Sequence, residues 1–462
     1  MKKYISICFT LILMSCNNFV DIVPKGQTIP ETVDDLAKML NNSGATRGSE
    51  VQCCLSDNIT LYSDDYTVTE NPESFMYNGD DPITRNVCAW ADYIYTDVED
   101  DSDWNRFYKS NYSCNYVINH IGEVQEGMSY RRNEVKGQAL VHRAMNFFLL
   151  VNVYGKQYDA RTAGTDLGVP LMLEGDINKQ EARATVAQVY ERIFEDLNEA
   201  LTLLTEDMPR YAHIPGRAAA YALRSRVWLW QQNYDKAYED AVEALKIRHE
   251  LIDYNTCSLY DEAEGPILGV DGYEEDHTVN IESLYARSWM SNGIGSLMYS
   301  PAMENIIDKD HDLRYKLFIG TLDGMYFNTL FARMNYSGIQ VSEVWLTKAE
   351  AALRKSQPDI PEAIEALDYV RQHRYDNFQT TTLTDKKQLL TEILNERRRE
   401  IIFNEMSFLD RKRQNADPET ARPMTRTVFG KTYTLPVGDP HYQLPIPLNV
   451  MNMNKLLIQN ER

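Results

Sequence analysis

Hydrophobic residues recur at steps of three and four along most of this chain, and this period is typical of amphipathic α-helices. The clearest stripe lies at residues 186–204, where the apolar positions are Val186, Val189, Tyr190, Ile193, Phe194, Leu197, Leu201 and Leu204. Thr185 and Gln188 form a capping box, which marks the start of this helix. A similar stripe covers residues 140–151. The pattern therefore predicts long helices that each bury one face.

Several segments have the form of a helix hairpin in which small residues face large ones across a tight turn. The two clearest pairs are residues 217–231 with 236–248 and residues 344–354 with 362–374. They resemble tetratricopeptide units, which bury their apolar faces by stacking. Two further pairs are indicated by the helix that ends at Tyr154 with residues 186–204, and by residues 389–408. We predict a mainly α fold, an α-α superhelix of about four tetratricopeptide-like helix pairs with long loop insertions and little β structure.

The segments between the predicted helices are long and irregular. The least helical stretches are residues 42–98, 253–312 and 414–462, which hold clusters of Gly, Pro, Asn and Asp. Short β-favouring runs occur only around residues 279–284 and 428–435. Because loops of this length in a compact protein usually carry function, we expect the binding residues there.

The N-terminus has the order of a bacterial lipoprotein signal. A basic start is followed by an apolar run at residues 4–14, which is too short to span a bilayer. Leu13-Met14-Ser15-Cys16 then looks like a lipobox. Residues 1–15 are predicted as a signal peptide, Cys16 as the lipid attachment site, and residues 16–462 as a single helical domain.

Composition excludes several classes of protein. The chain has 462 residues with 68 acidic and 47 basic side chains and a net charge of −21, which argues against nucleic-acid binding and against attachment to anionic lipid through a basic patch. A hydrophobic content of 43% argues against intrinsic disorder. The cysteines outside the signal segment fit no zinc spacing, and we interpret them as small buried hydrophobic residues.

No catalytic signature is present. The sequence contains no HExxH, GxSxG, P-loop or GxGxxG motif, and its eight histidines have no metal-ligand spacing. Asp308, Asp310 and Asp312 begin like a calcium loop, but Leu313 and Ile319 occupy the positions of its Gly and bidentate Glu. We therefore expect no enzyme activity, no cofactor and no metal. The charged cluster at residues 396–400 is interpreted as a set of ion pairs between scaffold helices.

A series of blocks in the right order resembles the SusD/RagB family of outer-membrane lipoproteins of nutrient uptake. The blocks lie at residues 18–24, 32–36, 104–118, 143–155, 168–171, 189–197, 217–244, 345–351, 396–400, 410–413, 444–447 and 459–460. The resemblance implies a helical fold on four tetratricopeptide-like pairs without enzyme activity. It implies a lipid-anchored protein at the cell surface that captures glycan and delivers it to a TonB-dependent SusC-like transporter of the outer membrane.

The ligand residues of this family lie outside the shared blocks, so candidates come from composition and location. Trp104, Trp228, Trp230 and Trp345 lie in helical blocks and are assigned to the core, whereas Trp90 and Trp289 lie in irregular segments. Because sugars pack their C–H faces on aromatic rings, an exposed aromatic with polar neighbours is the expected platform. The predicted ligand-binding residues are Arg85, Trp90, Tyr93, Tyr95, Trp289, Asn292 and Tyr299. Each tryptophan has an equally weighted alternative as a buried anchor of its loop.

Three other functions stay open at this point. A peptide-capturing relative would bind peptides and no glycan. A helical-repeat scaffold that binds only its transporter would bury Trp90 and Trp289 and have no aromatic cleft. A glycosidase would need two carboxylates roughly 5–10 Å apart in a cleft.

Overall fold

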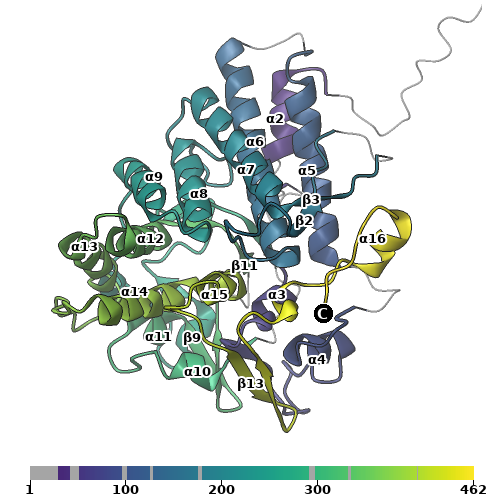
Figure 1. Ribbon diagram of the computed structural model, residues 1–462. Coiled ribbons are helices and arrows are strands. Elements are labelled where there is room, and N and C mark those ends of the chain that lie inside the picture. Colours follow the sequence, from purple (N-terminus) through teal and green to yellow (C-terminus); the bar gives the residue numbers. More distant parts are fainter. Residues whose placement is uncertain are drawn as a thin grey trace, which may run out of the picture.

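The structure is a computed structural model, which describes residues 30–41, 51–95, 101–124, 128–174, 179–290, 297–330, 334–402 and 404–462. Helices dominate it (Figure 1). In chain order they are α2 (Val33–Asn41), α3 (Asp57–Tyr62), α4 (Pro82–Cys88), α5 (Ser102–His120), α6 (Ser129–Tyr154), α7 (Val186–Leu203), α8 (Arg217–Trp230), α9 (Tyr234–Ile247), α10 (Pro301–Glu304), α11 (Leu313–Phe318), α12 (Val341–Arg354), α13 (Ile360–Arg371), α14 (Lys386–Ile401), α15 (Ser407–Asn415) and α16 (Leu448–Met453). Short 3₁₀ turns are η2 (Tyr254–Thr256), η3 (Gly265–Leu268) and η4 (Pro440–Tyr442).

The long helices are paired as the hydrophobic period predicts. Helix α6 packs on α7, α8 on α9, and α12 on α13, and Figure 1 shows these pairs following one another from the top of the molecule to its left side. In the second pair the small residues Ala237, Ala241 and Ala244 of α9 are fully buried, which allows the helices to approach closely. The capping box at Thr185 and Gln188 is present at the start of α7. The mainly α fold with paired helices is confirmed.

Strands in the described part of the chain are short and form two-stranded antiparallel pieces. They are β1 (Tyr66–Thr67), β2 (Leu167–Pro170), β3 (Arg183–Thr185), β4 (Ser258–Leu259), β5 (Val270–Asp271), β6 (Ser283–Tyr285), β7 (Ser288–Met290), β8 (Met298–Tyr299), β9 (Ile319–Leu322), β10 (Met325–Asn328), β11 (Met334–Tyr336), β12 (Ile339–Gln340), β13 (Met424–Val428) and β14 (Lys431–Leu435). The β-favouring run at 428–435 falls in the β13–β14 hairpin, whereas the run at 279–284 overlaps only the start of β6.

One large apolar cluster joins the helix pairs to the irregular segments. It includes residues of α3, α6, α8 and α12 together with residues of β13 and β14. Trp104, Trp230 and Trp345 are buried in it, and Trp228 is half-buried and packs on Phe194 in a tilted pair with ring centroids 3.9 Å apart. Among the described cysteines, Cys53, Cys54, Cys88 and Cys114 are free and buried, as predicted, whereas Cys257 is free but only half-buried.

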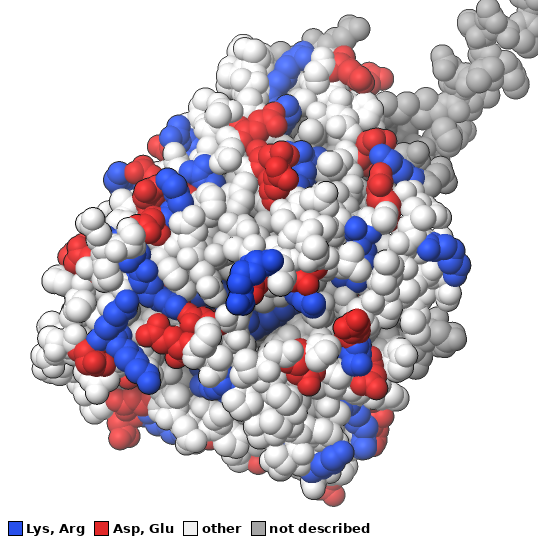
Figure 2. Space-filling model, viewed as in Figure 1, with Lys and Arg blue, Asp and Glu red and all other residues white. Residues whose placement is uncertain are grey.

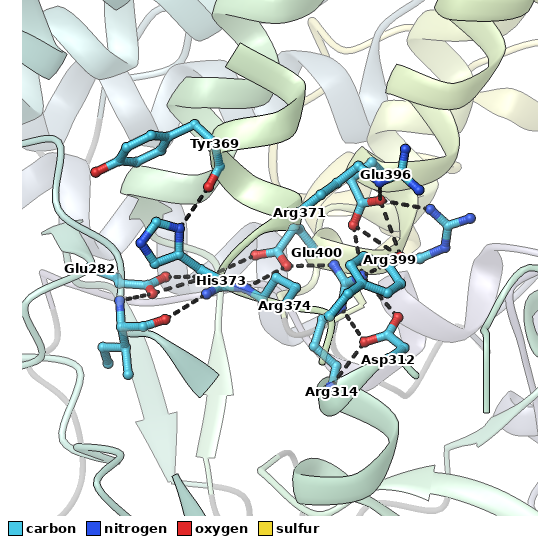
Figure 3. A network of polar contacts seen from close by, with 12 residues as sticks. Glu282, Asp312, Arg314, Tyr369, Arg371, His373, Arg374, Glu396, Arg399 and Glu400 are labelled. Atoms are coloured by element: carbon cyan, nitrogen blue, oxygen red, sulfur yellow. Dashed lines mark hydrogen bonds and ion pairs between the residues drawn. The ribbon is translucent and has the colours of Figure 1, made fainter. Parts of the chain in front are cut away.

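A buried network of charges ties α11, α13 and α14 to the strand region (Figure 3). Arg374 lies just after α13, and it donates from Nη2 to Glu282 Oε2 at 2.8 Å and from Nε to Glu400 Oε1 at 3.0 Å. Arg314 on α11 donates to Glu400 Oε1 at 2.6 Å and to Glu396 Oε1 at 2.7 Å. All five side chains are buried. The cluster at residues 396–400 therefore joins scaffold elements, as its sequence indicates.

A second set of buried pairs links α8, α12, α14 and α15. Glu343 on α12 accepts hydrogen bonds from Arg226 at 2.8 Å and from Arg397 at 3.1 Å. Arg397 also donates to Asp410 on α15 at 2.9 Å. Because each of these charges has an opposite partner at hydrogen-bond distance, the desolvation that burial imposes is offset and the helices are held in one register.

Within the described ranges, none of the helices combines the length and the apolar composition that crossing a lipid bilayer requires. The predicted signal peptide and Cys16 lie outside the described residues.

Candidate functional site

Four of the predicted ligand residues lie on or just after α4. The helix begins at Pro82, whose fixed φ suits the first helical position, and the side chain of Asp81 accepts the backbone N–H of Thr84 at 2.7 Å. It ends in a Schellman motif, because the N–H of Ala91 donates to the carbonyl of Asn86 and the N–H of Trp90 donates to that of Val87. The structure thus brings Arg85, Trp90 and the following loop together.

Trp90 occupies the left-handed position of this motif, where glycine is usual. Its φ is +48°, a conformation that costs a non-glycine residue about 1–2 kcal/mol. The side chain is only 5% exposed, its Nε1–H donates to the carbonyl of Tyr62 at 2.9 Å, and the Arg426 guanidinium lies 5.0 Å from the ring centre. Trp90 therefore anchors the loop to the core and offers no ring face to solvent in this structure.

The loop that Trp90 anchors carries Tyr93 at the surface. Tyr93 is 63% exposed, whereas Tyr95 packs against the core and accepts a hydrogen bond from Asn58 Nδ2 at 3.4 Å. Burial raises the pKa of Tyr95 well above its usual value. Beside Tyr93 in the chain, the exposed Asp92 lies 2.9 Å from Nε2 of His441. Tyr93 is thus an exposed ring whose chain neighbour Asp92 pairs with His441.

A second ring, which is half-buried, comes from the tip of the β13–β14 hairpin. Phe429 and Gly430 are the two loop residues, with φ values of +53° and +67°, which is the pattern of a type I′ turn. The guanidinium of Arg85 lies 4.8 Å from the centre of the Phe429 ring and 3.7 Å from Asp80. Figure 1 shows α4 and the hairpin beside each other at the lower right of the molecule. We use the name α4 surface for Arg85, Tyr93 and Phe429 with Tyr77, whose hydroxyl donates to Asp80 at 3.2 Å.

The second group of predicted ligand residues is Trp289, Asn292 and Tyr299. In the described part of the chain these residues do not form a site around an exposed ring. Trp289 lies on β7, where its backbone is opposite Asn335 of β11, and its side chain is outside the described part; Asn292 is outside it entirely. Tyr299 on β8 is fully buried against Tyr66 of β1, with ring centroids 5.8 Å apart. Its hydroxyl finds no hydrogen-bond partner among the residues that the structure describes, and burial raises its pKa well above its usual value. Tyr299 therefore packs β8 onto β1.

Phe429 and Tyr77 were not identified from the sequence. The available signal was the Phe-Gly pair inside the β-favouring run, because a two-residue turn at that point places the first loop residue at the tip. Tyr62, Tyr66, Tyr299 and Trp90 are all buried, although they lie in stretches whose sequence has no helical pattern.

The acidic sequence at Asp308, Asp310 and Asp312 serves the local structure. The Asp308 carboxylate accepts the N–H of Asp310 at 3.1 Å, and Asp312 is buried and accepts Nε of Arg314 at 2.8 Å. Among the described residues no group of three His, Cys, Asp or Glu side chains is placed to hold a metal ion. Asp312 thus caps the start of α11 and pairs with the buried Arg314.

Comparison with protein families finds two related matches that together cover about three quarters of the chain. A SusD-like family, described as starch-binding and associating with the outer membrane, matches residues 19–229. The model of the SusD family matches residues 321–462. None of the curated proteins is a significant match to the chain.

Several solved structures have the same fold. A SusD superfamily protein from Bacteroides thetaiotaomicron aligns with a TM-score of 0.71 at 21% identity over 93% of this chain and 100% of its own. A SusD superfamily protein from Bacteroides vulgatus aligns with a TM-score of 0.70 at 20% identity over 93% of this chain and 99% of its own. A SusD-like carbohydrate binding protein from Bacteroides vulgatus aligns with a TM-score of 0.65 at 18% identity over 93% of this chain and 98% of its own.

Proposed function

The chain belongs to the SusD family, and we propose that it is a lipoprotein that binds oligosaccharide or polysaccharide without breaking bonds and delivers it to a TonB-dependent SusC-like transporter. SusD family proteins are non-catalytic binding proteins. Starch binding in the description of the matching family and carbohydrate binding by a structural relative support a glycan as the ligand.

The observation that carries the proposal is the composition of the α4 surface. It includes the exposed ring of Tyr93, whose chain neighbour Asp92 pairs with His441, and the guanidinium of Arg85, which contacts Asp80 and the half-buried ring of Phe429. Rings of this kind pack on the C–H faces of a sugar, while carboxylates and a guanidinium bind its hydroxyls. We therefore assign glycan contact to Tyr93, Arg85 and Phe429, and we assign positioning to Trp90 and Tyr95. Trp289 and Asn292 stay proposed ligand residues.

Isothermal titration with a panel of neutral oligosaccharides tests this assignment. Tyr93→Ala is expected to lower affinity by roughly 10- to 100-fold, the range for truncation of a central aromatic contact. Tyr260→Ala is the matched control, because Tyr260 is 65% exposed in another loop and its removal should leave the affinity unchanged. Equal affinities for both variants would contradict the assignment to the α4 surface. Binding of peptides but of no glycan would replace the ligand class with peptide.

One observation favours a second candidate, a helical scaffold that binds only its transporter. That function requires Trp90 to be buried, as it is. The two candidates are distinguished by the same titration, since the scaffold binds neither glycan nor peptide while still associating with the transporter. Co-purification of a TonB-dependent barrel with the tagged protein from the outer membrane tests the partner that both candidates share.

The membrane anchor is the remaining part of the proposal. The description of the SusD-like family includes association with the outer membrane, and the lipobox-like sequence supports lipid attachment at Cys16. Cys16→Ser is expected to abolish incorporation of labelled palmitate and to move the protein out of the membrane fraction. Digestion of the protein by protease added to intact cells would support display on the cell surface, and complete protection would place the protein on the periplasmic face.

A further inference from the structure

A small pocket lies between α14 and α15, away from the α4 surface. Its volume is about 180 Å³, and its lining includes the basic side chains Lys387, Arg398, Arg411 and Arg422. Figure 2 shows a band of Lys and Arg side chains over α14 and α15, with acidic side chains beside it. The pocket shares no lining residue with the α4 surface, so it is a separate feature of the molecule.

Two of the pocket arginines are matched by carboxylates behind them. Arg398 Nε donates to Oδ1 of Asp65 at 2.7 Å, and Arg422 Nη1 donates to Oδ2 of Asp64 at 2.7 Å. Both aspartates are buried. Asp65 and Asp64 are thus each engaged by another arginine of the pocket.

Arg411 is the exception. It is only 7% exposed, yet its guanidinium has no hydrogen bond or ion pair with any described residue, and its Nε atom is buried without a partner. Burial and the nearby Arg422 outweigh the more distant attraction of Asp65 and Asp64 and lower the pKa of Arg411 to about 10, so the side chain is still charged at neutral pH. An unpaired buried cation is unfavourable, and proteins retain one where a ligand supplies the counter-charge.

The balance of charge around the pocket points the same way. The four cations Lys387, Arg398, Arg411 and Arg422 face the carboxylates of Asp64, Asp65 and Glu419. Glu419 is in addition within 3.8 Å of Arg354, outside the pocket. The whole chain is acidic, so the positive charge of the pocket cannot be explained by a generally basic surface. It is a local feature of the pocket.

We propose that this pocket binds a small ligand through an oxyanion group, namely a carboxylate, sulfate or phosphate, held by Arg411 with help from Lys387. A guanidinium donates two parallel N–H bonds to such a group, and these charge-assisted bonds are among the strongest in proteins. Lys387 adds a flexible point charge at the mouth, where it is exposed. The site is independent of the proposed glycan function, so either one can fail while the other stands.

Titration calorimetry with sodium sulfate, sodium phosphate, glucuronate and glucose, at constant ionic strength in chloride, tests this proposal. At least one oxyanion should bind saturably and glucose should not, and the comparison of inorganic ions with glucuronate tells a free ion from an acidic sugar. Arg411→Met should weaken binding roughly tenfold or more, the expected loss of a charge-assisted pair. Absence of saturable oxyanion binding would overturn the proposal, as would unchanged binding in Arg411→Met.

If Arg411→Met does not fold, two lysines at the start of α14 provide a second test. Lys386 and Lys387 are both exposed in the first turn of α14, but only Lys387 lines the pocket. Lys387→Gln should weaken oxyanion binding and Lys386→Gln should not. Equal effects of the two substitutions would show that only the general surface charge matters and would refute a specific site.

Discussion

The guanidinium of Arg85 lies 4.8 Å from the centre of the Phe429 ring, and this contact joins α4 to the tip of a hairpin more than 300 residues later in the chain. Phe429 reaches Arg85 from a left-handed backbone position. The β9–β10 hairpin makes the same two-residue turn with Asp323 and Gly324, the residue types that such turns prefer. Phe429 is thus an unusual residue for the first position of such a turn. Its presence there is consistent with a role of its side chain in contacting another group.

Phe429→Asn should therefore separate stability from binding. Asparagine adopts the left-handed conformation more readily than phenylalanine, which offsets the lost packing of the half-buried ring, so the free energy of unfolding should change by no more than about 1 kcal/mol. Glycan affinity should fall, because the stacked ring is lost. Urea denaturation and calorimetric titration of the same preparation measure both quantities. Loss of stability together with retained affinity would mean that Phe429 serves the fold and does not contact the ligand.

Because Trp90 is buried, its replacement should lower the stability of the protein and should not remove a direct contact with the ligand. Trp90→Ala should lower the free energy of unfolding by about 3–5 kcal/mol, since it empties a filled site and removes the hydrogen bond to Tyr62. Trp90→Phe keeps most of the apolar volume, so it should cost less and, below its melting temperature, bind glycan like the native protein. Native stability with abolished binding in Trp90→Phe would instead indicate that the indole meets the ligand after the loop opens.

The helical scaffold was predictable because its signals are local. The capping box at Thr185 and the alanine-rich face of α9 specify helices from neighbouring residues alone, and the structure contains both. Whether one loop aromatic is exposed depends on distant residues. Trp90 is covered by Arg426, which belongs to a strand 336 residues further along, and Tyr299 is covered by Tyr66 through a pairing of two-residue strands. No period of the sequence carries this information. The sequence therefore left exposed and buried positions of Trp90 equally weighted, and the structure has the buried one, while ligand contact by Tyr93 stays a prediction.

The charge network predicts a large penalty for loss of one arginine. Arg374→Met leaves the buried Glu282 without its guanidinium and leaves Glu400 with Arg314 alone, so the free energy of unfolding should fall by about 3–5 kcal/mol. Arg161→Met is the surface control, because Arg161 and Asp159 form an exposed pair that solvent screens and that should contribute little to stability. Chemical denaturation measures both variants. A penalty for Arg374→Met as small as that of the control would show that the network adds little stability.

Acid should weaken the same network through Glu400. Burial by itself would raise the pKa of this carboxyl, but the guanidinium groups of Arg374 and Arg314 outweigh burial and hold the pKa at about 2. A carboxyl whose pKa is lower in the folded than in the unfolded state contributes stability above its unfolded pKa, and this contribution is lost as pH falls toward the folded value. The contribution of Glu400 should therefore be complete near pH 6, on the order of 3 kcal/mol, and should disappear between about pH 5 and pH 2.

The difference in unfolding free energy between the native protein and Glu400→Gln isolates this effect. The comparison is needed because burial raises the pKa of Glu282 despite Arg374, so protonation of Glu282 favours the folded state as pH falls and opposes the loss at Glu400. Since both proteins contain Glu282, its contribution largely cancels in the difference. The difference should be greatest above pH 5 and shrink on acidification. A difference that stays constant from pH 6 to pH 3 would mean that Glu400 has an ordinary pKa and that its two arginines act only through packing.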